Sequence, residues 1–150
     1  MFDGLNNSLI LSVVRHVIEH FELSLDELHN DSTTVTFHGD YDESALVGFR
    51  RGLRTMGITW GHNKDHRPDL KQLLYTLTVT EDGGVPIYFT TDSGNTTDDT
   101  THLKTWELLR ELVGHPDFLY VADCKLASRE NLRAIEARGG RFITVLPRTR

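Results

Sequence analysis

The sequence predicts a mixed α/β fold in which a five-stranded sheet has three antiparallel strands followed by two parallel ones. Two alternating β-type runs flank Asp82-Gly83-Gly84, whose glycines supply the positive φ of a tight hairpin turn. The run FLYVA at 118–122 is apolar on both faces, as in a central strand covered on both sides. A helical segment separates this run from the strand RFITVLP at 141–147. That connection is too long for a hairpin, so these two strands should be parallel.

Composition indicates an ordinary globular protein. The chain has 150 residues, of which 38% are hydrophobic and 25% charged, enough to bury a core. No apolar run approaches the roughly 20 residues that cross a bilayer, and the N-terminus lacks a cationic signal region, so we expect a cytoplasmic protein without membrane partners. The single cysteine, Cys124, excludes an intrachain disulfide. The net charge of -6 argues against coating nucleic acid by charge alone.

The first half of the chain begins with an amphipathic helix and one strand. Apolar residues recur every four positions from Leu5 to Phe21, the spacing of a helix with one buried face. Ser24 and Glu27 have the spacing of a capping box for a short turn. The β-branched run at 30–39 predicts a strand. Residues 39–69 show no sustained period, which predicts a long loop of the kind that often carries function.

The second half contains the hairpin, then two helices that alternate with the last two strands. Asp98 or Asp99 can cap the first helix, and Gly114 ends it. Ser128 caps the second helix, and Gly139-Gly140 ends it. The complete order of elements, with three strands before the alternation, matches the ribonuclease H-like fold.

Two aspartates fall at strand ends in this arrangement. Asp31 lies at the start of the first strand and shares a face with Thr33, whereas Asp123 follows the central run. If these strands are adjacent, the two carboxylates can share a divalent cation, because Mg²⁺ prefers oxygen ligands. Two metal ions about 4 Å apart can activate an attacking oxygen and stabilise a leaving one. Asp123 can equally be a residue that simply opens the next loop, and the residues alone leave both interpretations open.

Four blocks in order carry a family resemblance, namely HNDSTTVTFHG, GHNKDHRPDLKQLL, DGGVPIYFTTDSGNTTDDTTH and FLYVADCKLASRENL with GGRFITVLPRTR. They resemble the DDE transposases of bacterial insertion sequences, in the branch whose first acid lies in Asp-Ser/Thr-Thr and whose second lies in Val-Ala-Asp. The similarity runs from Leu28 to Arg150. It implies that Asp31 and Asp123 are the first two catalytic acids. In that family they hold Mg²⁺ or Mn²⁺ in a two-metal site. This site activates water, and later a DNA 3'-hydroxyl, for attack on phosphodiesters.

The same resemblance implies that the segment containing Gly94, Asn95 and Asp98, together with Thr33, shapes the edge of the site. Asp98 is equally well explained as a plain helix cap.

A local cluster of basic residues falls in the block that leads into the hairpin. Residues 50–71 hold six Lys or Arg and two Asp, and six minus two gives a local charge of +4. By the resemblance, Lys64, Arg67 and Lys71 contact DNA phosphates. The competing interpretation pairs Arg67 with Asp65 or Asp69.

One departure from the family concerns the third acid, a glutamate on a helix beyond the last strand. Glu130 and Glu136 precede that strand, so neither matches its position. We therefore expect residues 1–29 to be a helical remnant of the upstream region and residues 30–150 to be an incomplete catalytic core.

The resulting functional hypothesis is a transposase fragment. Its full-length form would be a homodimeric, nucleoid-associated enzyme. It would perform DNA transposition, a form of DNA recombination, by acting as a nuclease and strand transferase on transposon ends and target DNA. One alternative is a catalytically silent remnant that binds DNA or dimerises with an active transposase. Another is an unrelated α/β binding domain in which Asp123 opens a ligand crevice.

Overall fold

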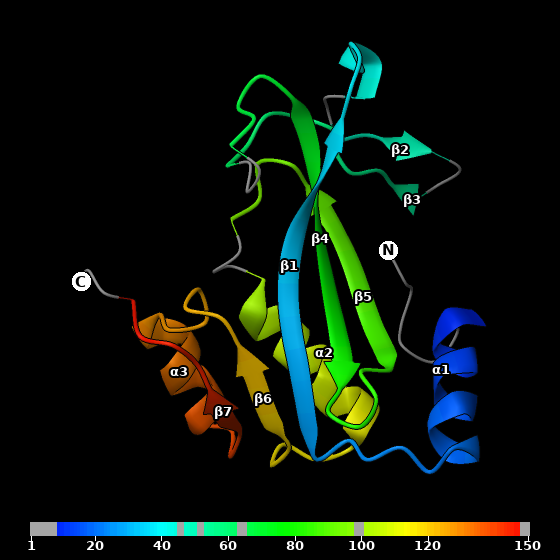
Figure 1. Cartoon of the computed structure of the whole chain (residues 1–150), viewed down its shortest axis with the longest axis vertical. Helices are drawn as coiled ribbons and strands as arrows, with labels where there is room; N and C mark the ends of the chain where they lie inside the picture. Colours follow the sequence, from blue (N-terminus) through cyan, green and yellow to red (C-terminus); the bar gives the residue numbers. More distant parts are fainter. Residues whose placement is uncertain (1–8, 45–46, 51–52, 63–65, 98–100, 148–150) are drawn as a thin grey trace. The chain divides into compact units, whose positions relative to one another are not determined.

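The computed structural model describes residues 9–44, 47–50, 53–62, 66–97 and 101–147. Its main sheet has five strands in the order β5-β4-β1-β6-β7 (Figure 1). The elements are α1 (Leu9–His20), β1 (Glu27–Phe37), the 3-10 helix η1 (Asp42–Ser44), β2 (Phe49–Arg50), β3 (Leu53–Arg54), β4 (Lys71–Thr80), β5 (Pro86–Ser93), α2 (His102–Val113), β6 (Leu119–Ala122), α3 (Arg129–Glu136) and β7 (Arg141–Ile143).

The strand directions are those of a mixed sheet. The Glu81 N–H donates to the Glu27 carbonyl at 3.2 Å, and Thr78 is hydrogen-bonded to Asn30. From the first contact to the second, the residue number rises on β1 and falls on β4. The two strands are therefore antiparallel, as the arrows in Figure 1 show. β1 and β6 are parallel, and so are β6 and β7. The predicted ribonuclease H-like sheet, with the first strand at its centre, is therefore confirmed.

Contacts along the chain divide it into two compact units. The first unit contains residues 32–76 and 89–97, and the second contains residues 2–31, 77–88 and 98–150. Strands β1, β4 and β5 contribute residues to both units. The predicted boundary between residues 29 and 30 stays a prediction. Within the described ranges, no helix has the length and apolar character needed to cross a bilayer.

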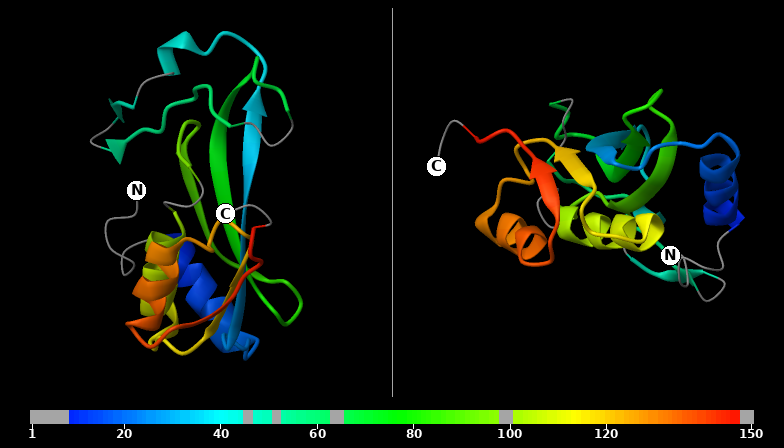
Figure 2. Two further views of the ribbon diagram at one scale, coloured as in Figure 1. Left: turned by 90° about the vertical axis from the view of Figure 1, so that its left-hand side faces the viewer. Right: turned by 90° about the horizontal axis from the view of Figure 1, so that it is seen from below.

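The second unit holds the larger apolar core. Trp106 and Leu109 on α2, Ile135 on α3, and Phe118 and Tyr120 around β6 are all at most 1% exposed. The Trp106 and Phe118 rings stack with their centroids 6.2 Å apart. Figure 2 shows α2 and α3 side by side along β6 and β7. α1 adds the partly buried Val14 and Ile18 to this core. The predicted stripe of α1 is not its buried face, because Leu9, Val13 and Phe21 are 80%, 55% and 66% exposed.

The stop of α2 and the cap of α3 follow the sequence, whereas α3 ends at Glu136 with Ala137 as its C-cap, before the predicted stop at Gly139-Gly140. Gly114 ends α2 with a φ of 91°, a left-handed value that glycine adopts without strain. The Ser128 hydroxyl accepts a hydrogen bond from the Asn131 N–H at 3.1 Å and caps α3. The predicted caps Asp98 and Asp99 lie outside the described residues.

The start of β1 differs from the prediction. The Ser24 hydroxyl accepts from the Asp26 N–H at 3.2 Å, and Glu27 begins the strand, so no capping box forms. Asp31 is consequently inside β1 and not at its start. Val35 is 43% exposed. The burial of β1 alternates, with the even-numbered side chains such as Leu28 and Asn30 more buried than Asp31 and Val35. The buried face therefore carries polar residues, which the pattern of apolar residues does not indicate.

The first unit contains structure where a long loop was predicted. Within residues 39–69 lie η1 and the pair β2–β3. Thr59 also bridges to Gln72 on β4 through two backbone hydrogen bonds of 3.2 and 2.9 Å. These pairings join positions that are separated in sequence, and for this reason no local period announced them.

Candidate active site

Strand register brings the two predicted acids to neighbouring positions. The parallel pairing of β1 with β6 begins at Glu27↔Leu119 and ends at Asn30↔Ala122. Asp31 is the next residue of β1, and Asp123 directly follows the last residue of β6; both are exposed. Neighbouring strands lie about 4.8 Å apart, a spacing at which two carboxylates can reach one cation. Joint metal binding by Asp31 and Asp123 remains a prediction.

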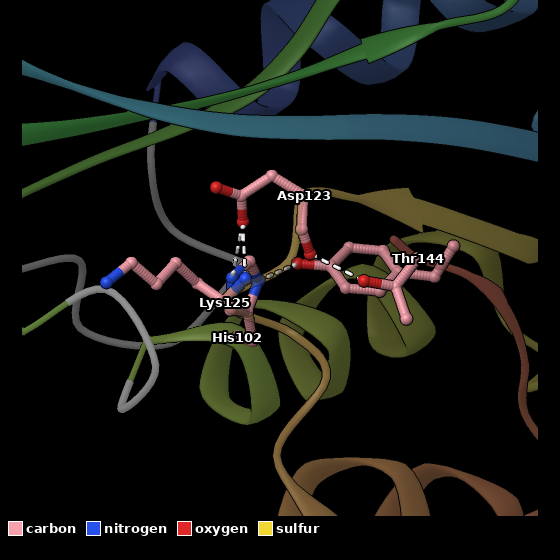
Figure 3. Close-up of polar contacts among 5 residues, drawn as sticks. His102, Asp123, Lys125 and Thr144 are labelled. Carbon is pink, nitrogen blue, oxygen red and sulfur yellow. Dashed lines mark hydrogen bonds and ion pairs between the residues drawn. The ribbon is translucent and has the colours of Figure 1, made fainter. Parts of the chain in front are cut away.

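Asp123 is held by its own turn and by the segment after β7. Its Oδ1 accepts a hydrogen bond from the Lys125 N–H at 3.0 Å (Figure 3). Its carbonyl accepts from the Thr144 hydroxyl at 2.6 Å and from the Leu126 N–H at 3.2 Å. The simpler interpretation, an aspartate that opens a loop, therefore describes part of its role. The same contacts restrict the orientation of a carboxylate that is 44% exposed.

His102 is a residue of this site that the sequence analysis missed. It begins α2 and is 4% exposed, and its Nε2 lies 3.7 Å from Oδ1 of Asp123. Its Nδ1 lies 3.2 Å from the hydroxyl oxygen of Tyr120, and the two rings meet edge to face. No spacing in the sequence links His102 to Asp123, because α2 and β6 are brought together by packing.

Tyr120 connects this contact to the interior of the second unit. Burial raises the pKa of the Tyr120 phenol, and the negative charge of Asp123 adds to the rise. Asn30 is 4% exposed, and its Oδ1 accepts from the Thr78 hydroxyl at 2.9 Å. We call the three residues Tyr120, His102 and Asp123 the Asp123 network.

The carboxylate pair suits a hard divalent ion. Mg²⁺ and Mn²⁺ take oxygen ligands and keep several waters, so two aspartates on adjacent strands are a chemically suitable start for a site. In the part of the chain that the structure describes, no group of three or more His, Cys, Asp or Glu side chains is arranged to hold a metal ion. The residues present thus fit one ion bound by two carboxylates better than a complete two-metal site.

The predicted edge residues lie in different parts of the fold. Thr33 is exposed on β1, two positions after Asp31. Asn95 is exposed after β5 in the first unit, next to the buried Gly94, whereas Asp98 lies outside the described residues. Their contribution to the site edge stays a prediction.

Arg67 shows the intramolecular pairing that was the alternative to DNA contact. Its Nε donates to Oδ1 of Asp69 at 2.8 Å, and its Nη2 donates to Oδ2 at 2.6 Å. The hydrogen bond from Arg67 lowers the pKa of Asp69 to about 2. Both side chains are about half exposed, so solvent and other anions can reach the pair.

Of Arg67 and Lys71, the two predicted DNA-binding cations that the structure describes, Lys71 is the less accessible. Its side chain is 5% exposed, and its ammonium donates to the Asp40 carbonyl and to the Asp42 carboxylate. The Nζ also lies 4.7 Å from the centroid of the Trp60 ring. A DNA phosphate would have to replace these partners. Lys64 lies outside the described residues, and DNA contact by the three cations remains a prediction.

Comparison with known proteins gives a likeness of fold only. No family model matches this chain, and no curated protein matches it. A pre-cleavage Mos1 transpososome is similar at 10% identity with a TM-score of 0.49, covering 93% of this chain and 42% of that chain. A Mos1 transposase paired-end complex with the left transposon end is similar at 12% identity with a TM-score of 0.48, covering 89% of this chain and 39% of that chain. This chain therefore spans about two-fifths of the length of those proteins.

Proposed function

We propose that this chain is the first part of the catalytic core of a DDE transposase of the insertion-sequence type. The observation that supports this most directly is the β1–β6 register, in which Asp31 and Asp123 follow the last paired residues Asn30 and Ala122. The four sequence blocks that resemble the family contain both aspartates. A ribonuclease H-like sheet with an acid on its central strand and another at the end of the adjacent strand is suited to phosphodiester chemistry.

In this proposal Asp31 and Asp123 bind Mg²⁺ or Mn²⁺ directly. The metal, when bound, polarises the phosphodiester and activates the attacking oxygen. The protein residues orient the ion: β1 fixes Asp31 within a hydrogen-bonded strand, and the turn after β6 fixes Asp123. A third acid, a glutamate from a segment after Arg150, would complete the two-metal site.

DNA is the proposed partner, as transposon ends and as target. Of Arg67 and Lys71, the two predicted cations that the structure describes, Arg67 is the better placed. Its side chain is 49% exposed, and its partner is an exposed carboxylate that a phosphate can replace. Lys64 and Lys71 would add positioning contacts that carry no sequence information. We further propose that the full-length protein is a homodimer and associates with the nucleoid.

A second candidate function is a catalytically silent transposase remnant that binds DNA or pairs with an active copy. The observation in its favour is that, among the described residues, no third metal-binding side chain joins Asp31 and Asp123. It predicts DNA binding without cleavage under any divalent ion.

Mn²⁺ titration of this chain tests the metal site. Paramagnetic broadening should be strongest at amide signals near Thr33 and Ala122, and Asp31→Asn and Asp123→Asn should each weaken Mn²⁺ affinity about 10-fold or more. The matched control is Asp117→Asn, because Asp117 is 70% exposed and precedes β6 at its other end. Mn²⁺ is used as the probe in place of zinc or nickel, because imidazole pairs bind those two ions. The rings of His16 and His20 on α1 form such a pair, with their centroids 5.7 Å apart. Unchanged affinity in either site variant would refute the assignment.

DNA chemistry separates the two candidate functions. In a protein extended through any downstream segment encoded with it, Asp31→Asn or Asp123→Asn should abolish strand cleavage while DNA binding persists. Cleavage that never appears, with DNA binding intact, would favour the silent remnant.

A further inference from the structure

We propose that His102 is a positioning residue that fixes the carboxylate of Asp123 for metal binding. The inference rests on the proposed function and extends it to a residue on α2. It is carried by one geometric fact: both ring nitrogens of a buried histidine face side chains near the C-terminal end of β6.

The two carboxylate oxygens of Asp123 have different surroundings. Oδ1 accepts from the Lys125 N–H at 3.0 Å and lies 3.7 Å from Nε2 of His102. Figure 3 shows the other oxygen pointing away from both His102 and Lys125. Donors on one side therefore hold Oδ1, and Oδ2 is left as the oxygen that can bind a cation.

The charge of Asp123 assigns the imidazole proton. Nε2 of His102 lies 3.7 Å from Oδ1 of Asp123, and the negative carboxylate favours a proton on that nitrogen. Nδ1 is then the acceptor. The phenol of Tyr120, 3.2 Å away, donates a hydrogen bond to Nδ1.

The donors in the Asp123 network consequently point the same way. Tyr120 donates to His102, and the Nε2–H of His102 faces Asp123. At 3.7 Å the last contact is electrostatic and longer than a hydrogen bond. An N–H dipole from a buried ring still favours one carboxylate orientation, because the low local dielectric strengthens the interaction.

The network is also rigid. Tyr120 is 0% exposed and His102 is 4% exposed, so neither ring can leave without opening the core of the second unit. Outer residues that orient metal ligands typically change metal affinity 10- to 100-fold when they are replaced. His102 has the same relationship to Asp123 as such residues have to a metal ligand.

The experiment compares Mn²⁺ affinity in variants of the full chain. His102→Leu removes the donor and should weaken Mn²⁺ binding about 10-fold. His102→Gln keeps an N–H donor at the distal position and should restore affinity to within about 3-fold of the parent. In an Asp123→Asn background, His102→Leu should cause no further loss, because His102 acts through that carboxylate. A further 10-fold loss in the double variant, or equal losses for Leu and Gln, would overturn the proposal.

The tautomer of His102 in the unmodified protein gives a measurement that does not depend on variants folding. Long-range ¹H–¹⁵N NMR spectra should show the proton on Nε2, and a proton on Nδ1 would overturn the proposal. The metal site and the role of His102 are distinguished by different results. Unchanged Mn²⁺ affinity in Asp123→Asn removes the proposed metal site itself. Weakened binding in Asp123→Asn combined with unchanged binding in His102→Leu removes only the role of His102.

Discussion

Lys71 and Asp42 form an ion pair in which the cation is buried and the anion is not: the side chains are 5% and 81% exposed. The ammonium also donates to the Asp40 carbonyl and lies over the Trp60 ring. A buried charge is costly unless it is paired, so these contacts are what permit a lysine at the first position of β4.

Asp42→Asn should destabilise the protein by about 1 kcal/mol, because the buried ammonium loses its charged partner while water can still reach the exposed side of the pair. Urea unfolding at neutral pH measures this change. Glu43→Gln is the matched control, since Glu43 is an exposed acid in the same short helix. An equal loss in both variants would show that general charge, and not this pair, stabilises the region.

The burial of Lys71 predicts that its substitution affects DNA binding less than substitution of Arg67 does. Arg67→Gln should reduce the slope of log affinity against log salt by about one, since one phosphate contact is removed. Lys71→Met should change the slope less, because its ammonium already has partners within the protein. Fluorescence anisotropy across a salt series measures both slopes. A larger change for Lys71→Met would contradict this order.

Asp69 should titrate far below a normal aspartate. Its pKa is lowered from the ordinary aspartate value of 3.8 to about 2, mainly by the hydrogen bond from Arg67. Because the folded-state pKa is depressed, the pair favours the folded state above the unfolded pKa and loses that effect as pH falls toward 2. Carboxyl ¹³C NMR should show this midpoint, and Arg67→Gln should return it toward 3.8. A midpoint unaffected by that substitution would mean that the pair does not persist in solution.

Two threonines on β4 provide a matched test of buried hydroxyls. Thr78 donates to Asn30, whereas the buried hydroxyl of Thr76 has no hydrogen-bond partner among the described residues. Thr78→Val should therefore cost about 1–2 kcal/mol, while Thr76→Val should be nearly neutral or stabilising. Thermal or urea unfolding measures both. Equal losses would indicate that the Thr78–Asn30 bond contributes nothing specific.

Gly94 is required by close backbone approach. A Cβ at this position would overlap the carbonyl oxygens of Gln72 and Thr59, which belong to the bridge between β4 and residue 59. Gly94→Ala should cost about 2 kcal/mol or more, because backbone atoms must move to admit the methyl group. Asn95→Ala, at the exposed neighbouring position, should leave stability within about 0.5 kcal/mol of the parent. Hydrogen exchange at Gln72 would report the loosened bridge. A fully stable Gly94→Ala protein would contradict the close approach.

Much of the fold could be predicted because local chemistry determines it. The glycines after Asp82 specify a hairpin, Ser128 caps α3, and Gly114 ends α2, all from residues adjacent in sequence. The order of these elements was sufficient to predict a central first strand beside the strand that ends before Asp123. The starting residue of β1 and the bridge at Thr59 could not be predicted in this way, since pairing with distant backbone decides both.

The sequence by itself determined the type of fold and the identity of the two candidate acids, because periodicity, turn residues and family-like blocks are properties of neighbouring positions. Only the tertiary structure decided which groups surround those acids. His102 faces Asp123 because α2 packs against β6, and Lys71 is buried because residues 40 and 42 close over it. Such contacts depend on the packing of segments far apart in the chain, which no local pattern records.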